Sequence, residues 1–250
     1  MTRKHAGPSL LAGLVGVGLV FATFTACADP LSEALNAAGK QEFSSTLRVF
    51  MLMTMLSFIP VILIGMTCFT RIIVVLALLR HALGIPQTPP NSVLITLAML
   101  LTLFSMGPVL DKVQRDALSP YLADQITATE AVSRATPALR DFMVRQTRES
   151  DLLAVSEMAR VAPPRTVEEI RFTHLAAAFI LSELKTAFQM GFVIFLPFLM
   201  IDIVVSAVLM ALGIIMLPPA TVSLPLKLLL FILIDGWVLV SRTLLGSIWS

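Results

Sequence analysis

The chain has 250 residues, of which 57% are hydrophobic and only 14% are charged, and its mean hydropathy is +0.89. A water-soluble domain cannot solvate so apolar a surface, so the composition indicates a membrane protein. The net charge of +2 is the small difference between 18 basic and 16 acidic side chains, and no basic stripe or run supports nucleic-acid binding. Two cysteines, Cys27 and Cys68, provide neither a disulfide framework nor a CxxC metal motif.

The first 28 residues have the order of a secretory signal peptide. Two basic residues and a histidine precede an apolar run over residues 10–24, and the small residues Ala-Cys-Ala follow at 26–28. Fifteen apolar residues are fewer than the roughly 20 that span a bilayer, which favours a cleaved signal over an anchor helix. We therefore expect cleavage after Ala28, with residues 29–48 as a short periplasmic segment. An uncleaved anchor and a lipoprotein acylated at Cys27 are the alternatives.

Residues 49–110 predict the first of two hydrophobic hairpins. The pattern over residues 49–79 predicts one long helix, which carries no charge as far as Phe69. Glycine and prolines between residues 84 and 90 then force a turn, because proline cannot continue a helix. A second helix follows over residues 92–110, with Ser92 as its expected N-cap. Basic residues on the side of the turn favour a cytoplasmic turn by the positive-inside rule, and they are Arg71, Arg80 and His81.

Residues 111–173 contain 19 of the 34 charged residues, ten acidic and nine basic, and predict a small helical domain outside the bilayer. Capping boxes at 127–130 and 166–169, and Pro137 after Thr136, mark expected helix starts. Because the signal peptide sends the N-terminus outward and one hairpin precedes this segment, we expect it in the periplasm. Its basic residues are compatible with that side, since loops of roughly 60 residues translocate largely regardless of charge.

Residues 174–250 predict the second hydrophobic hairpin. One long helix over 174–216, interrupted strongly only by Pro197, ends at a tight turn formed by Leu217 and two prolines. A fourth helix then continues to about Leu245. The tip of this hairpin, residues 210–220, includes Met216, whose flexible thioether is suited to seal around variable cargo if the tip points into a pore.

No catalytic motif accompanies these helices. The patterns HExxH, GxSxG, GxxxxGK[ST], and GxGxxG after a strand are absent from the sequence, so we expect no enzymatic activity, cofactor or metal. The ionisable residues of the second hairpin are more informative, because each is costly in hydrocarbon and by default marks a function or a protein-facing surface. These residues are Glu183, Lys185, Asp202, Lys227, Asp235 and Arg242.

Two of these carboxylates are placed symmetrically about the hairpin turn. Asp202 precedes Pro218 by sixteen residues and Asp235 follows Pro219 by sixteen, which is about 24 Å along a helix in each case. They are expected at similar depth on facing helices, where they either share a proton or each meet a separate donor. Structural hydrogen bonding and proton or ion handling are both open, so an ion-coupled transporter is an alternative function. Lys227 is near enough to the turn to extend toward the cytoplasm.

Several motifs closely resemble the FliP family of flagellar biosynthetic proteins, whose counterparts serve virulence type III secretion. The longest is AAFILSELKTAFQMGF at 177–192, continued by IFLPFLMIDIVVSAVLMALG and LPPATVSLPLKLLLFILIDGW. Further matches are SFIP at 57–60, MTCFTRIIVVLALLRHALG at 66–84, TPPN at 88–91 and RQTRESDL at 145–152. The resemblance covers the chain from about Ser57 to its C-terminus.

The resemblance implies an all-α membrane protein in which two long hairpins flank a small periplasmic helical segment. It implies a core subunit of the type III protein export gate, without catalysis of its own, that assembles as about a pentamer with the companion proteins FliQ and FliR into a helical pore. Such a complex lies in the basal body at the bacterial inner membrane, with a large periplasmic portion, and passes unfolded rod, hook and filament proteins. The expected signal peptide favours the flagellar apparatus over the virulence one.

Particular residues take their expected roles from the same resemblance. The family's gate includes a methionine-rich loop at the position of residues 210–220, which implies that Met210, Ile214, Ile215 and Met216 line the pore gate. Only Met216 of the triplet 214–216 is methionine here, and isoleucine is stiffer at χ1, so a ring of mixed apolar side chains is expected. Glu183, within the longest motif, and Phe142 are expected to contact other subunits.

Overall fold

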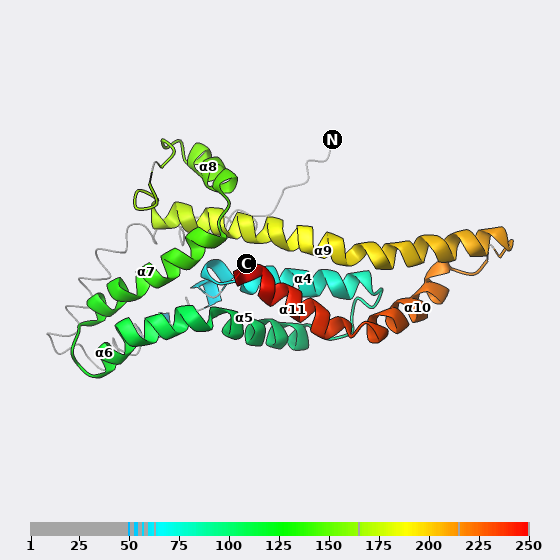
Figure 1. The fold of residues 1–250 in the computed structure, drawn as a ribbon, viewed down its shortest axis with the longest axis horizontal. Coiled ribbons are helices and arrows are strands. Elements are labelled where there is room, and N and C mark those ends of the chain that lie inside the picture. The colour runs from blue at the N-terminus through cyan, green and yellow to red at the C-terminus, as the bar shows by residue number, and fades with distance from the viewer. Residues whose placement is uncertain are drawn as a thin grey trace, which may run out of the picture.

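The computed structural model describes residues 50, 53–54, 57, 60–62, 64–164, 166–214 and 216–249. These residues form an elongated helical bundle, in which no strand occurs (Figure 1). The prediction of an all-α membrane protein is confirmed. The expected signal peptide at 1–28 and the segment 29–48 lie outside the described residues.

The first hairpin contains α4 (Phe69–Ala82) and α5 (Asn91–Val113). The expected single helix over 49–79 is wrong, because helical segments Pro60–Met66 and Phe69–Ala82 meet at 81°. The α5 helix begins one residue before the expected cap Ser92. It continues through a π-helical turn (Gln114–Leu118) into the short α6 (Ser119–Leu122).

The charged segment folds into α7 (Ala128–Gln146) and α8 (Glu149–Met158). The first capping box is confirmed, because Thr127 Oγ1 accepts a hydrogen bond from the Glu130 N–H at 3.3 Å. The expected start at Pro137 is wrong, since α7 already begins at Ala128 and runs through this proline.

The second expected capping box, at residues 166–169, forms a turn instead of a helix start. Arg140 on α7 explains this difference. Its Nη2 donates to the carbonyl oxygens of Val167 and Ile170, both at 2.6 Å. The side chain therefore uses carbonyl groups that a helix beginning there would need for its own hydrogen bonds, and the long helix starts only after the turn.

The long helix α9 (Phe172–Ala211) has 40 residues, which corresponds to about 60 Å. Pro197 lies inside it, as expected. The helix ends five residues before the expected Met216, because Gly213 takes a φ of +72° and closes the C-terminal turn, a conformation that glycine adopts without strain.

After the hairpin tip, α10 (Pro219–Leu233) and α11 (Gly236–Trp249) replace the single fourth helix that the sequence predicts. They are bent by 64° relative to each other. Asp235 takes a φ of +51° between them, which ends α10. The bend turns the buried stripe of α11 toward α5, and the stripe consists of Gly236, Val240, Leu244 and Ile248.

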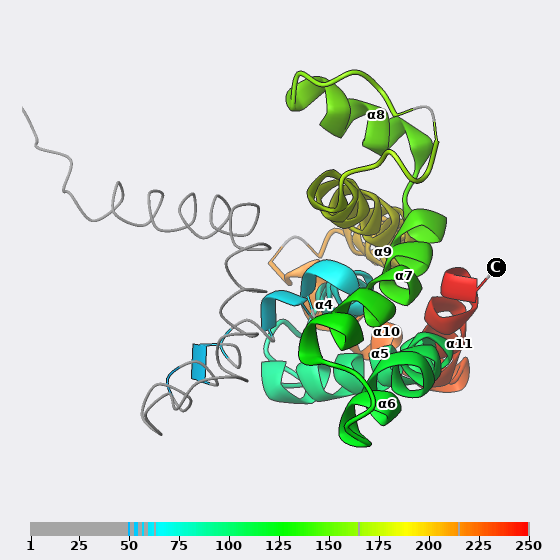
Figure 2. The ribbon, with the colours of Figure 1, turned by 90° about the vertical axis from the view of Figure 1, so that its left-hand side faces the viewer.

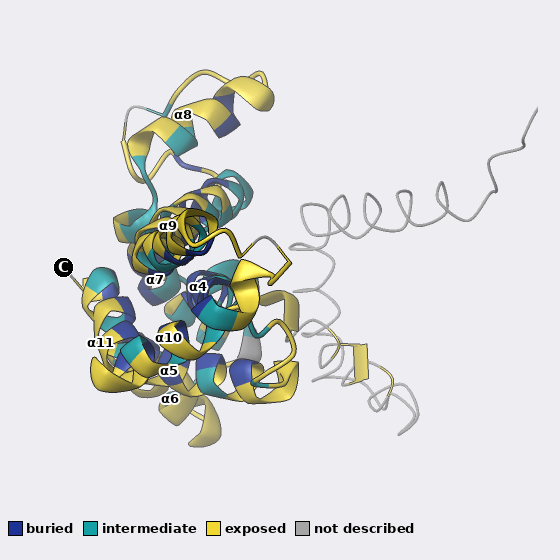
Figure 3. Cartoon of the chain, turned by 90° about the vertical axis from the view of Figure 1, so that its right-hand side faces the viewer, coloured by how far each residue is buried: buried dark blue, intermediate teal, exposed yellow. Residues whose placement is uncertain are grey.

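The core surrounds α4, which lies between α9 and α5 (Figures 1 and 2). Its buried residues Ile72, Val75, Leu76 and Leu79 face these neighbours from one helical stripe. The outer surfaces of the bundle are largely exposed, as the yellow colouring of Figure 3 shows. The central helix α4 therefore joins α9 to α5.

Two helices of the described residues are long and apolar enough to cross a membrane. They are Asn91–Leu122 and Phe172–Ala211, and the number rises to four if each bent helix pair counts as one span. In Phe172–Ala211, only 17% of the most apolar stretch of 18 residues is buried within the described chain.

The close packing of α9 on α4 predicts different effects for two glycines. A Cβ at Gly191 would lie 3.1 Å from Leu78 Cβ and closer still to its Cδ1, whereas a Cβ at Gly246 meets nothing within 4 Å. We expect Gly191→Ala to destabilise the subunit by about 1–3 kcal/mol. Gly246→Ala should stabilise it by about 0.5–1 kcal/mol, because alanine favours the helix. Thermal denaturation in detergent, followed by gel filtration, measures both; equal midpoints would contradict this packing.

Candidate functional site

A buried ion pair between Arg71 of α4 and Glu183 of α9 lies inside the bundle. Nη2 and Nε of the guanidinium donate to the two carboxylate oxygens at 2.5 and 3.0 Å. The side chains are only 3% and 0% exposed. Removing two charges from water costs several kcal/mol per ion, so such a pair persists only when its geometry is good and its remaining hydrogen-bonding groups are satisfied.

The remaining donors of Arg71 are satisfied by two other helices. Nη2 also donates to Gln146 Oε1 at 2.8 Å, and Nη1 donates to the carbonyl and hydroxyl oxygens of Ser247 at 3.0 and 3.3 Å. Together with the bonds to Glu183, these five hydrogen bonds match the five N–H donors of a guanidinium. One side chain thus joins α4, α7, α9 and α11.

The end of α11 is held by neighbouring groups. Gln146 Nε2 donates to the carbonyl oxygen of Ile248 at 2.6 Å, and the indole N–H of Trp249 donates to the carbonyl oxygen of Ser105 at 2.9 Å. The carbonyl oxygens of Ser247 and Ile248 belong to the last turn of a helix, where no intrahelical donor is available. Arg71 and Gln146 therefore cap α11 from two different helices.

Phe142 and Glu183, the two residues expected to contact other subunits, both lie inside this subunit. Each is 0% exposed. The ring of Phe142 contacts Phe179 edge-on at 5.9 Å between centroids and Trp249 at 6.3 Å. Neither side chain reaches the surface, so each affects assembly only through the helices that it holds together. Their role at subunit contacts stays a prediction.

A second polar group attaches α8 to residues 182–189 of α9. Lys185, expected as an intramembrane polar residue, lies 3.4 Å from a carboxylate oxygen of Asp151 on α8. Ser182 Oγ donates to the other oxygen of Asp151 at 2.7 Å, and it accepts the backbone N–H of Arg148 at 3.0 Å. The guanidinium of Arg148 donates to Thr186 and Gln189. The charged helix α8 therefore covers one face of this part of α9.

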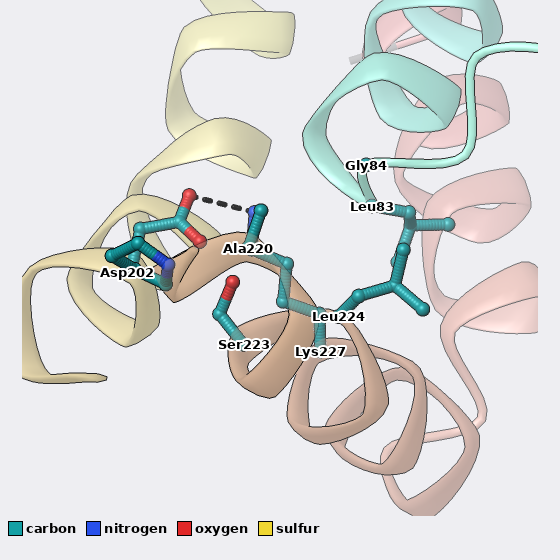
Figure 4. A pocket seen from close by; sticks show the side chains of 8 residues that line it. Leu83, Gly84, Asp202, Ala220, Ser223, Leu224 and Lys227 are labelled. Atoms are coloured by element: carbon teal, nitrogen blue, oxygen red, sulfur yellow. Dashed lines mark hydrogen bonds and ion pairs between the residues drawn. The ribbon is translucent and has the colours of Figure 1, made fainter. Parts of the chain in front are cut away.

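Lys227 of α10 pairs with Asp202 of α9 at 2.7 Å, near the hairpin tip. The buried ammonium group also donates to the carbonyl oxygen of Ala82 at the end of α4, at 3.2 Å. Figure 4 shows this bond between Asp202 and Lys227 beside a pocket of about 210 Å³, which Leu83 and Gly84 also line. Lys227 thus ties α9, α10 and α4 together, and the prediction that it extends toward the cytoplasm is wrong.

Asp235 lies away from Asp202 in this arrangement. Asp202 meets its own donor, Lys227, which is one of the two alternatives that the sequence leaves open. Asp235 is exposed at the break between α10 and α11. Within the described residues its carboxylate forms no hydrogen bond or ion pair. The symmetric spacing about the turn does not produce a carboxylate pair, because α9 already ends at Ala211 and Lys227, eight residues before Asp235, lies at the level of Asp202.

The hairpin tip exposes the apolar side chains expected at the pore gate. Met216 is 99% exposed and Met210 is 71% exposed, while Ile214 is also exposed. Ile215 lies outside the described residues. The tip between α9 and α10 extends past the turn after α4, as the orange end of the molecule in Figure 1 shows. It is an apolar projection that the rest of the described chain leaves uncovered.

Sequence reasoning identified Glu183 but missed its partners Arg71, Gln146 and Ser247. Arg71 was interpreted only as a basic residue near a turn. Its position within an otherwise apolar helix was the available indication, because an arginine in such surroundings requires a buried acceptor. Gln146 and Ser247 gave no comparable indication, since polar residues near helix ends are usually solvated.

Replacing Glu183 should destabilise the subunit strongly. Glu183→Gln leaves the buried guanidinium of Arg71 without its counter-charge, and we expect a loss of about 3–5 kcal/mol. The matched control is Glu130→Gln on α7, which removes an exposed pair with Arg134 and should cost at most about 0.5 kcal/mol. Thermal denaturation in detergent compares the two variants. Similar midpoints for both would contradict a central role for the buried pair, and adding Arg71→Met to Glu183→Gln should restore part of the loss.

The chain also shows close similarity to known proteins. The FliP family matches residues 52–244. The flagellar biosynthetic protein FliP of Cereibacter sphaeroides is 46% identical over 98% of this chain and 80% of its own length. The proteins of the same name from Pectobacterium carotovorum subsp. carotovorum and Bacillus subtilis (strain 168) are 49% and 45% identical, over 85% and 87% of this chain and 82% and 100% of their own lengths. The chain therefore belongs to the FliP family.

Proposed function

We propose that this chain is a core subunit of the flagellar type III protein export gate and that its exposed hairpin tip lines the channel. The main support for this proposal is the exposure of the apolar side chains at the hairpin tip. In a member of a family named for flagellar biosynthesis, α9 and α10 present Met216, 99% exposed, at the end of an apolar projection. An apolar projection that the described part of its own subunit leaves uncovered requires other subunits, lipid or cargo around it.

The length of α9 supports an assembly that extends beyond the bilayer. About 60 Å of helix is twice the roughly 30 Å of a hydrocarbon core. The charged helix α8 covers one face of residues 182–189, which fits an aqueous environment at that level. The uncovered part after Gly191 presents an almost continuous apolar surface. Contact with other copies of the chain accounts for this surface better than lipid along its whole length.

The proposed assembly contains about five copies of this chain together with FliQ and FliR, and it lies at the inner membrane in the flagellar basal body. Residues 111–173 face the periplasm in this arrangement, and a cleaved signal peptide directs them there. Met210, Ile214, Ile215 and Met216 of each copy contribute to an apolar ring. Unfolded rod, hook and filament proteins pass through the ring, and the chain itself performs no catalysis.

Removal of the gene tests the proposed function at the level of the cell. We expect the deletion strain to lack flagella and to retain rod, hook and filament proteins inside the cell, and the intact gene supplied on a plasmid should restore both. Electron microscopy and immunoblots of the culture medium give the two readouts. Normal flagella in the deletion strain would refute the proposal.

Cysteine cross-linking tests the position of the hairpin tip. In a background with Cys27→Ser and Cys68→Ala, Met216→Cys should form disulfides between copies upon oxidation, because the tips converge at the channel. Met158→Cys on α8 is the matched control, since this methionine is also exposed but lies far from the tip. Non-reducing gels of membranes measure the covalent dimer. Equal yields at both positions, or none at 216, would place the tip elsewhere.

A further inference from the structure

The hairpin tip contains only one kind of chemically reactive side chain. Residues 210–220 include no ionisable, hydroxyl, amide or thiol group, and their only side-chain heteroatoms are the sulfur atoms of Met210 and Met216. Protonation, phosphorylation and disulfide formation therefore have no target among these side chains. A covalent change in the polarity of the tip must occur at a thioether, which is oxidised to the polar methionine sulfoxide.

Both sulfur-containing side chains of the tip are open to solvent. Met216 lies in the turn between α9 and α10 and is 99% exposed, while Met210 in the last turn of α9 is 71% exposed. The tip is the orange end of the molecule in Figure 1. By contrast, Met106 and Met143 are buried in the core. Because oxidation requires direct access of the oxidant to sulfur, the methionines of the tip are more susceptible than those of the core.

Oxidation at the tip leaves the fold of the subunit intact. The side chain of Met216 is fully exposed, so an added oxygen atom displaces no neighbour within the described part of the chain. The ion pair between Asp202 and Lys227, which holds the hairpin to α4, contains no sulfur. The chemical change is therefore confined to the surface that the tip presents to other molecules.

A sulfoxide changes the character of that surface. Ile214 and Leu217 are exposed close to Met216 in the chain, so the tip is otherwise apolar. A sulfoxide oxygen is a hydrogen-bond acceptor, and burying it against such side chains without a donor costs free energy. Where the tips of several copies converge, water must enter to supply the missing donor. Oxidation therefore weakens the apolar contact between the tips.

We propose that Met216 and Met210 are sites of reversible oxidation by hydrogen peroxide, and that their oxidation loosens the apolar ring formed by the tips. The sulfur lone pair attacks one peroxide oxygen, an S–O bond forms as the O–O bond breaks, and proton transfer releases water. Sulfur loses two electrons, which the peroxide gains. Methionine sulfoxide reductases reverse the change with two electrons and two protons from a pair of thiols, and water is again released. This inference rests on the proposed function, because it assigns a redox response to the proposed channel ring.

The rate of oxidation at each methionine tests the site. The full chain in detergent and the assembled gate are each treated with hydrogen peroxide, and peptide mass spectrometry follows every sulfoxide. Met216 should oxidise at least roughly tenfold faster than the buried Met143. Met200, which is 59% exposed on the uncovered surface of α9, should become protected on assembly, whereas the channel should keep Met216 accessible. Equal rates at residues 216 and 143, or equal protection of Met200 and Met216, would overturn the inference.

Leakage through the assembled gate tests the consequence of oxidation. The gate is reconstituted in vesicles of phosphatidylethanolamine and phosphatidylglycerol that are loaded with a fluorescent dye. Peroxide should raise dye release by roughly tenfold, because an unpaired acceptor weakens the apolar contact, and methionine sulfoxide reductases should reverse the rise. In a variant that combines Met210→Leu with Met216→Leu, the side chains stay apolar but lack sulfur, so this peroxide-induced rise should disappear.

A polar substitution at the tip should reproduce the oxidised state without peroxide. Met216→Gln resembles the sulfoxide in polarity, so its gate should release dye before any treatment. Met158→Gln is the matched control, since this methionine is also exposed but lies on α8, far from the tip, and its gate should release no additional dye.

The remaining outcomes distinguish this inference from the proposed function. A peroxide-induced rise that persists in the double leucine variant would overturn the inference, and so would a Met216→Gln gate that releases no more dye than the Met158→Gln gate. Either result leaves the deletion phenotype and the cross-linking at residue 216 as independent support for the export gate. Normal flagella in the deletion strain would overturn the channel role and this inference with it, whatever the rate at which Met216 is oxidised.

Discussion

The guanidinium of Arg71 is the group on which the arrangement of helices depends. It is buried, it carries a permanent charge, and its five hydrogen bonds reach α7, α9 and α11 from α4. A charge in this position is stable only when all of these acceptors are in place, so the helices must adopt one relative arrangement. Apolar contacts alone would tolerate several sliding registers between such similar surfaces, whereas a bidentate ion pair tolerates only one.

This fixed end of the bundle supports a projecting end. Beyond Gly191 the packing of α9 on α4 gives way to the second ion pair, in which Lys227 joins Asp202 and the end of α4. Beyond Asp202, toward the tip, the bundle consists only of the end of α9, the turn and the start of α10, and the apolar tip is exposed. The subunit thus combines a rigid base with a tip that is free to contact others. This arrangement is compatible with the proposed export gate, in which the tips of several copies line the channel.

Composition and proline positions predict the membrane character, the two hairpins and the charged segment between them, because helices in hydrocarbon need long uncharged runs. The ends of the individual helices were harder to predict from the sequence. The bends at residues 67–68 and 234–235 interrupt runs that are apolar throughout, so hydropathy does not mark them. Residues 166–169 have the composition of a capping box, but Arg140, which lies 27 and 30 residues earlier in the chain, donates hydrogen bonds to the carbonyl oxygens of Val167 and Ile170.

The sequence by itself determined that the chain is a helical membrane protein of the FliP family and that its ionisable residues need partners, since both follow from residue types and local spacing. Only the tertiary structure decided which partners they have. Glu183 and Arg71 are separated by 112 residues, and Asp202 pairs with Lys227 instead of Asp235. Such choices depend on how the chain bends between helices, which is set by packing across the whole bundle. That packing cannot be predicted from a local sequence pattern.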